Sequence, residues 1–280
     1  MEFLISVLKL FDYHIEKPEV FGWFHWLWIG LTIFVTVALC VWHKRSGTPD
    51  RVRRVVMGNA IFVIILEIYK MINYSFQEAN GFAFDFQWYA FPWQFCSTPM
   101  YIGLLAGIIR KGKIHECLCA YLATFAVFAG LAVTVYPGDV FTPVLGVDIQ
   151  SMICHASMIS VGIYLFYSGY VKLEHKTILK AIPVFAVCVT IALVLNEVMY
   201  YSGILDMADG SKETFNMFYI SGHFPSTLPI YGAVHNAVPF PVNAIIYILG
   251  FSLIAYVILL IAMGIGAIGK KLGKKQKVVA

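Results

Sequence analysis

Two side chains in this sequence have the chemistry of a nucleophile and its base. Cys96 ends the proline-containing run FPWQFC at 91–96, and His155 lies in a later apolar stretch. A thiol is a weak nucleophile until a base takes its proton, and a neutral imidazole is the usual base. The sequence therefore predicts a Cys/His pair in which Cys96 forms an acyl-thioester and His155 acts first as base and then as acid.

Seven other polar residues are candidates for supporting this pair. They are Glu67, Lys70, Gln94, Thr98, Asn196, Glu197 and Asn216. Glu197, Asn196 or Gln94 would orient the imidazole, as the third member does in Cys-His proteases. Thr98 lies two residues after Cys96 and is a competing nucleophile.

The elements that must position these residues are membrane-spanning helices. The chain has 280 residues, of which 60% are hydrophobic and 13% charged, and its mean hydropathy is +0.76. Soluble domains carry about 25% charged residues, so the composition predicts an all-α polytopic membrane protein. Seven charge-poor stretches are each long enough to cross about 30 Å of hydrocarbon. They are residues 21–42, 54–74, 88–109, 116–136, 149–169, 181–203 and 241–268.

The positions of the basic residues predict the orientation of the chain. Most Lys and Arg residues lie in the first, third and fifth connections and in the tail, whereas 75–87, 137–148 and 204–240 contain only Lys212. Positive residues concentrate in cytoplasmic loops, so we expect the N-terminus outside and the C-terminus in the cytoplasm. The predicted parts are an outer interfacial helix (1–20), a transmembrane domain (21–268) with an outer cap loop (204–240), and a basic cytoplasmic tail (269–280).

Four of the polar side chains are expected at one depth in the membrane. With a rise of about 1.5 Å per residue, Cys96 lies roughly 12 Å and His155 roughly 9 Å below the outer surface. Glu67 and Glu197 lie roughly 10 Å below it. Polar groups at such a depth are functional-site candidates. A site in this layer would meet the ester bonds of phospholipids, so we expect acyl transfer on (lyso)phospholipid-like substrates from the outer side.

Two other functions remain open from the sequence alone. Glu67 and Lys70 are three residues apart, share a helix face and can neutralise each other. Such a pair in the same layer also fits a substrate-binding membrane subunit or a transporter without catalysis. The third possibility is a membrane lipid hydrolase that uses Thr98 and His155.

The sequence predicts neither a cofactor nor a metal. Cys117 and Cys119 form a Cys-x-Cys pattern, but no cluster of histidines or carboxylates completes four ligands. The net charge of +4 is explained by basic cytoplasmic segments that face anionic lipid headgroups, so no nucleic-acid partner is expected. The oligomeric state does not follow from the sequence.

Three short motifs point to a known family. The run FPWQFC at 91–96, the run ICHAS at 153–157 and the run NMFY at 216–219 resemble the bacterial YwaF-like integral membrane proteins, which are grouped with the animal transmembrane protein 164 acyltransferases. The resemblance implies lipid acyl transfer in a bacterial cell membrane, through a Cys/His pair placed at Cys96 and His155. The bacterial pattern carries a histidine where this chain has Gln94.

Overall fold

The structure, a computed structural model, describes residues 2–279, and the side chains of residues 2, 4, 46 and 270–279 lie outside that description. The α-helices are α1 (Glu2–Phe11), α2 (Trp23–Ser46), α3 (Pro49–Ser75), α4 (Thr98–Ile108), α5 (Lys113–Ala123), α6 (Phe125–Val135), α7 (Leu145–Tyr167), α8 (Lys176–Tyr201), α9 (Tyr231–Ala237) and α10 (Val242–Val279). Three short 3-10 helices are η1 (Glu78–Asn80), η2 (Trp88–Ala90) and η3 (Met217–Tyr219). The described chain pairs as β-structure only in the isolated bridges His14–Val144 and Asp206–Lys212. The predicted all-α class is confirmed.

Six helical segments are long and apolar enough to cross a membrane. They are Trp23–Arg45, Pro49–Asn80, Lys113–Val135, Leu145–Tyr167, Lys176–Tyr201 and Val242–Gly269. The remaining predicted span, 88–109, contains the short 3-10 helix η2 and the 11-residue helix α4, and α4 at about 1.5 Å per residue covers about half of the hydrocarbon core. The count of seven spans and the orientation of the termini therefore stay predictions.

Two prolines explain why 88–109 is not one helix. Pro92 lacks a backbone N–H and disfavours helical backbone in the residue before it. The chain turns instead, and the Ser97 N–H donates to the Gln94 carbonyl over 2.9 Å. Pro99 lies in the first turn of α4, where proline is tolerated. The stretch before α4 is irregular backbone, which a membrane tolerates only where protein surrounds it.

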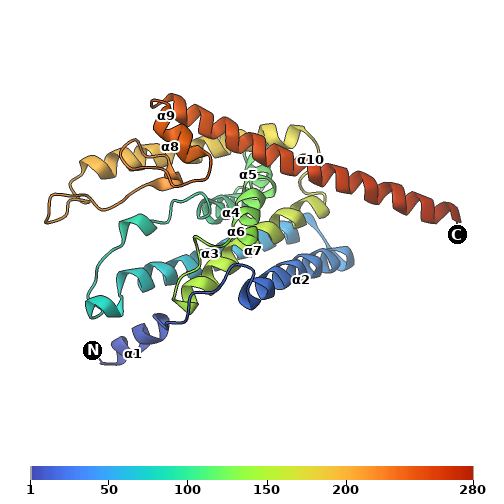
Figure 1. Ribbon diagram of the computed structural model, residues 1–280. Coiled ribbons are helices and arrows are strands. Elements are labelled where there is room, and N and C mark those ends of the chain that lie inside the picture. The colour runs from blue at the N-terminus through green and yellow to red at the C-terminus, as the bar shows by residue number, and fades with distance from the viewer. Residues whose placement is uncertain (1, 280) are drawn as a thin grey trace.

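The most buried of the six segments is the broken pair α5 and α6, which lies near the middle of the molecule (Figure 1). The break falls at Thr124, whose φ of −123° and ψ of −74° are not helical. Two glycines bring this pair close to α7. A Cβ on Gly130 would lie 2.7 Å from the His155 carbonyl oxygen, and one on Gly162 would overlap the Val127 side chain. Glycine therefore sets how closely α7, which carries His155, approaches α6.

Glycines also bring α4 close to α3. A Cβ on Gly103 would lie 3.1 Å from the Ala60 Cβ, and one on Gly107 would lie 2.5 Å from the Met57 Cβ. Larger residues at either position would push the two helices apart. This close packing holds the stretch before α4 beside the C-terminal half of α3.

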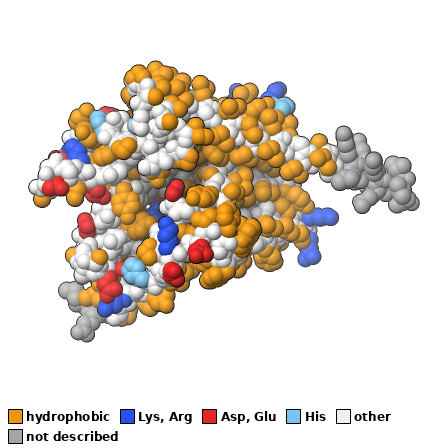
Figure 2. All heavy atoms as spheres, in the orientation of Figure 1, with side chains coloured by type: hydrophobic (Ala, Val, Ile, Leu, Met, Phe, Trp, Pro, Cys, Tyr) orange, Lys and Arg blue, Asp and Glu red, His pale blue; other side chains and the backbone are white. Residues whose placement is uncertain are grey.

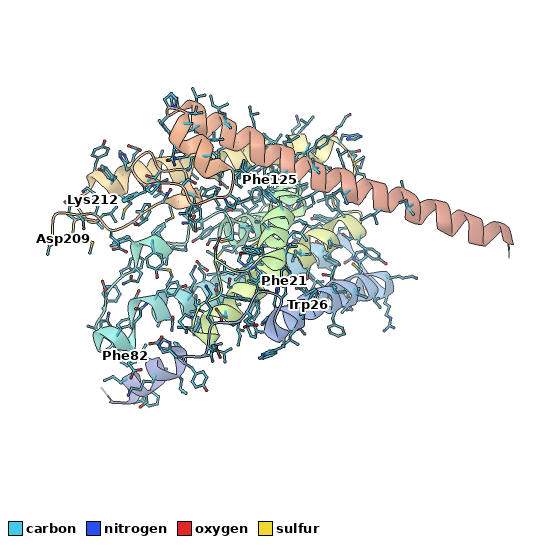
Figure 3. The ribbon with its side chains drawn as sticks, in the orientation of Figure 1. Phe21, Trp26, Phe82, Phe125, Asp209 and Lys212 are labelled. Atoms are coloured by element: carbon cyan, nitrogen blue, oxygen red, sulfur yellow. The ribbon has the colours of Figure 1, made fainter. Side chains whose placement is uncertain are left out.

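The connection 204–240 is packed into the bundle and is not a solvated loop. Its most deeply buried hydrophobic side chains have at most 1% of their surface exposed and are Leu205, Phe215, Met217, Phe218 and Ile220. Figure 1 shows this connection beside α8. Asp209 and Lys212 mark its exposed tip at the far left of Figure 3, whereas Phe125 lies near the centre of the molecule.

Many large hydrophobic side chains are exposed on the surface of the described residues. Figure 2 shows hydrophobic side chains across the middle of the drawn face, with acidic side chains gathered in the half that holds α1 and the connection 204–240. The long helix α10 projects from the opposite end (Figure 1). It runs on through the predicted basic tail, whose side chains from 270 onward lie outside the described part of the chain.

Candidate active site

A polar cavity of about 190 Å³ lies where α3, α7, the stretch before α4 and the connection 204–240 meet. Of the nine predicted site residues, those that line it are Glu67, Lys70, Gln94, Cys96 and His155. A pocket lined by nucleophilic, basic and charged groups is where an active site is expected. The predicted nucleophile and the predicted base therefore share one cavity.

Cys96 reaches the cavity from a turn rather than from a helix. It lies two residues before Thr98, the first residue of α4, and its side chain is partly exposed. The N-terminal end of a helix carries partial positive charge, which favours an anion such as a thiolate. The broken geometry of 88–109 thus places a thiol in front of the positive end of α4.

His155 lies on α7 and is almost completely buried. Its Nδ1 is 2.7 Å from the Ser151 carbonyl oxygen, one turn earlier on the same helix. A carbonyl oxygen only accepts hydrogen bonds, so Nδ1 donates and carries the proton, which leaves the lone pair on Nε2. Nε2 is buried and has no hydrogen-bond partner among the described residues. This is the tautomer that a general base needs.

A buried ion pair forms a second part of the cavity wall. The Lys70 ammonium donates to Glu67 Oε1 over 2.6 Å, as the three-residue spacing predicts, and the two side chains are only 18% and 7% exposed. The Gln150 amide donates to Glu67 Oε2 over 3.1 Å, and the Ser97 hydroxyl donates to Oε1 over 3.4 Å. Glu67 thus joins α3 to α7 and to the stretch before α4. Lys70 supplies a positive charge to the cavity that contains Cys96.

Three predicted amide side chains hold the connection 204–240 in place. Gln94 donates to the Asn216 carbonyl over 3.1 Å and accepts from the Phe218 N–H over 2.9 Å. Asn196 donates to the Met217 carbonyl over 3.1 Å and accepts from the Met217 N–H over 2.8 Å. The Asn216 side chain accepts from the Ser221 N–H over 2.9 Å. We call Gln94, Asn196 and Asn216 the amide clamp.

The amide clamp holds a strained piece of backbone. Phe218 and Tyr219 have φ angles of +59° and +55°, a region that bulky residues rarely adopt. Such residues cost about 1–3 kcal/mol each and persist only when their surroundings fix them. Tyr219 lines the cavity with Cys96 and His155. Burial raises the pKa of the Tyr219 phenol, which keeps the group a neutral hydroxyl at the cavity wall.

Glu197 and Thr98 lie away from this cavity. Glu197 accepts from His223 Nε2 over 3.0 Å, and that imidazole stacks on Tyr200 with ring centroids 3.6 Å apart. The Thr98 hydroxyl is fully buried, 2.7 Å from the Tyr121 hydroxyl and 2.9 Å from the Phe95 carbonyl oxygen. Within the described chain, His155 Nδ1 donates the hydrogen bond that orients the ring to the Ser151 carbonyl oxygen, and not to a predicted side chain.

Sequence reasoning did not select Gln150, Ser151 or Tyr219 as site residues, although all three line the cavity. Ser151 lies four residues before His155 on α7, and Gln150 lies four residues before Cys154, which also lines the cavity, so helical spacing was the available signal. For Tyr219 the available signal was the run NMFY at 216–219, which carries the family resemblance; its position beside Cys96 and His155 depends on the path of 204–240.

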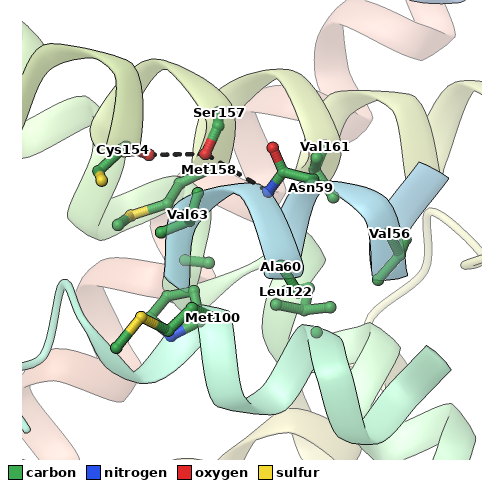
Figure 4. Close-up of a pocket in the computed structure, with 13 residues that line it drawn as sticks. Val56, Asn59, Ala60, Val63, Met100, Leu122, Cys154, Ser157, Met158 and Val161 are labelled. Carbon is green, nitrogen blue, oxygen red and sulfur yellow. Dashed lines mark hydrogen bonds between the residues drawn. The ribbon is translucent and has the colours of Figure 1, made fainter. Parts of the chain in front are cut away.

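Other cavities share lining residues with the polar one. A cavity of about 640 Å³ shares Tyr89, Gln94 and Tyr219 with it. A much smaller one of about 20 Å³ meets it at Cys154. Figure 4 shows this smaller space, where Asn59 donates to Ser157 over 3.4 Å and Ser157 donates to the Cys154 carbonyl over 2.8 Å.

The long apolar helices and the enclosed polar cavity define a multi-pass α-helical membrane protein with an internal polar site. The sequence model of the TMEM164 family matches residues 20–263. The chain therefore belongs to the TMEM164 family, which confirms the resemblance to transmembrane protein 164. No match was found among curated proteins or among solved structures.

Proposed function

We propose that this protein is an integral membrane acyltransferase that acts on (lyso)phospholipid-like substrates from the outer side of the cell membrane. One observation carries the proposal: Cys96 lines the same cavity as His155, whose buried Nε2 has no hydrogen-bond partner among the described residues. Family membership adds support, because the resemblance to the acyltransferase branch implied this chemistry at these two positions.

The first half of the reaction forms an acyl-enzyme. His155 Nε2 takes the proton of the Cys96 thiol, and the thiolate attacks the ester carbonyl carbon of a donor lipid. Lys70 also lines the cavity, and its ammonium has further N–H donors besides the one given to Glu67, so it stabilises charge on the carbonyl oxygen. The carbon–oxygen ester bond then breaks, and the imidazolium gives its proton to the departing lysolipid alkoxide. The acyl group remains on Cys96 as a thioester.

The second half transfers the acyl group. His155 Nε2 takes the proton of an acceptor lysolipid hydroxyl, whose oxygen attacks the thioester carbonyl carbon. The carbon–sulfur bond breaks, and the imidazolium returns the proton to the Cys96 thiolate. Both reactants are neutral at these atoms before and after the cycle, so no cofactor is required for proton or electron balance.

The test is transfer of a labelled acyl chain from a phospholipid to a lysophospholipid by the purified protein in proteoliposomes. Cys96→Ala should abolish transfer, and His155→Ala should reduce it at least about 100-fold, the usual range for loss of a general base. Cys40→Ala is the matched control, because Cys40 does not line the cavity. Full activity of Cys96→Ala in folded protein would refute the mechanism.

Trapping the intermediate separates the competing functions. A thioester on Cys96 is cleaved by neutral hydroxylamine, whereas an oxygen ester on Thr98, as a hydrolase would form, is resistant. A binding protein or transporter would form neither adduct, would tolerate Cys96→Ser, and would lose substrate binding with Glu67→Gln. The buried and hydrogen-bonded Thr98 hydroxyl supports the thioester outcome.

A further inference from the structure

An apolar groove runs beside the polar cavity, between α3 and α4. Its volume is about 350 Å³, and its walls include Ile68, Met71 and Ile72 of α3, Phe84 and Phe86 of the following connection, and Tyr101 of α4. From Ile64 to Ser75 the α3 side of the groove covers about 16 Å at about 1.5 Å per residue. The groove is therefore elongated and almost entirely hydrocarbon-lined.

Two of the few polar side chains in this groove already have hydrogen-bond partners. The Tyr101 hydroxyl donates to the Pro92 carbonyl over 3.0 Å, and Glu67 accepts from Lys70 over 2.6 Å. A polar ligand would find few groups to replace the water that it loses, so the groove favours an apolar occupant.

The groove is open to the outside of the helix bundle, on the side where α3 would meet lipid. Ile68 is 54% exposed and Phe84 is 68% exposed, and α3 belongs to a segment long and apolar enough to cross a bilayer. What meets such a surface in a bilayer is lipid chain. An acyl chain is therefore the occupant that the position and the lining of the groove select.

Glu67 lies between this groove and the polar cavity, because it lines both. We infer that the α3–α4 groove is the acyl-chain site, which holds the chain of a bilayer lipid while its ester group lies in the cavity beside Cys96. The inference rests on the proposed acyl transfer. It adds a lateral route by which the substrate enters from the bilayer, rather than from water.

Photocrosslinking tests the binding without requiring the reaction. Proteoliposomes of the Cys96→Ala variant would contain a phosphatidylcholine with a diazirine at the end of one acyl chain. Cross-links should concentrate on groove residues such as Met71, Ile72 and Phe86, above those on Ile61 and Phe62, which are lipid-facing residues of the same helix outside the groove. An even distribution of cross-links over these five positions would overturn the inference.

A filling substitution tests the site in the active protein. Met71→Trp should lower transfer of a long acyl chain about tenfold, because about two methylene groups of the chain would no longer be buried in the groove. Transfer of a six-carbon chain should be unchanged. Ile65→Trp is the matched control, because Ile65 is exposed on α3 and does not line the groove. Equal transfer of long and short chains by Met71→Trp would also overturn the inference.

The two proposals fail separately. If the protein transfers no acyl chain but cross-links still concentrate in the groove, the proposed reaction is wrong and the chain site stands. If transfer depends on Cys96 but cross-links are even along α3, the reaction stands and the groove is not the chain site.

Discussion

At the scale of single residues, the chemistry of His155 and of the Glu67–Lys70 pair depends on hydrogen-bond partners that the sequence does not identify. Sequence reasoning paired His155 with Cys96 but looked for its orienting group among Gln94, Asn196 and Glu197. The structure provides a main-chain oxygen at Ser151, and every residue type has such an oxygen. Composition and spacing therefore could not identify it.

The ion pair gives a prediction on stability. Lys70→Met should destabilise the protein by about 3–5 kcal/mol, because it leaves the Glu67 carboxylate buried without its cation. The double variant Glu67→Gln with Lys70→Met should recover most of that loss. Unfolding temperatures of the single and double variants in detergent form the mutant cycle that measures the coupling.

An exposed pair in the same protein is the control for this cycle. Lys180 and Glu116 are also 2.6 Å apart, but their side chains are 43% and 55% exposed. Lys180→Met should change stability by less than about 1 kcal/mol, since water screens exposed pairs. Equal losses for Lys70→Met and Lys180→Met would show that burial does not strengthen the Glu67–Lys70 pair.

The amide clamp gives a second prediction at this scale. Asn196→Ala should destabilise the protein by about 1–3 kcal/mol, because the Met217 N–H and carbonyl lose their partner inside the protein. Thr190→Ala on the same helix should have little effect, since that exposed hydroxyl donates only to the Ala186 carbonyl of its own helix. Thermal unfolding of both variants is the measurement, and an unchanged unfolding temperature for Asn196→Ala would contradict the role of the clamp.

At the scale of elements, glycine sets the positions of the helices that carry the site. Gly130→Ala should push α6 away from α7, because its Cβ would lie 2.7 Å from the His155 carbonyl oxygen. Since a displacement of about 1 Å can reduce a reaction about 100-fold, we expect acyl transfer to fall by up to that factor. Gly58→Ala on α3 should leave transfer unchanged, because nothing lies within 4 Å of its added Cβ. The measurement is the steady-state transfer rate of Gly130→Ala and of Gly58→Ala. Equal rates for these variants would exclude the proposal that tight α6–α7 packing positions the site.

The elements also show which parts of the fold are predictable. Residues 149–169 and 181–203 were expected as spans from their length and lack of charge, and α7 and α8 occupy them. The stretch 88–109 met the same criteria, but Pro92 and Pro99 prevent one continuous helix, and the α-helix in it begins only at Thr98. The course of 204–240 was beyond prediction, because side-chain amides from distant parts of the chain, Gln94 before α4 and Asn196 on α8, fix its backbone.

At the scale of the whole molecule, the open question is how often the chain crosses the bilayer. If α4 and the stretch before it cross together, Asn80 and Lys111 lie on opposite sides, and Asp209 lies on the same side as Asn80. If α4 does not cross, Asn80 and Lys111 share a side. Charge placement favours the first arrangement, because 75–87 carries no Lys or Arg.

Labelling of single introduced cysteines distinguishes these arrangements. A membrane-impermeant maleimide should label Asn80→Cys and Asp209→Cys in intact cells, and should label Lys111→Cys only after permeabilisation. All three positions are exposed. The unsubstituted protein is labelled in parallel as the control, because it contains only the native thiols. Labelling of Asn80→Cys and Lys111→Cys from the same side would rule out seven crossings.

The amide clamp also imposes an order on biogenesis. The Gln94 side chain binds backbone groups of residues 216 and 218, which the ribosome adds only after α5, α6, α7 and α8. Until then the turn around Cys96 lacks the contacts that enclose it, and irregular backbone without protein around it is unstable in lipid. The nascent chain must therefore hold the stretch 88–109 near the membrane surface or against the insertion machinery while its second half is translated. A chain truncated before residue 204 would insert its long helices and never close its cavity.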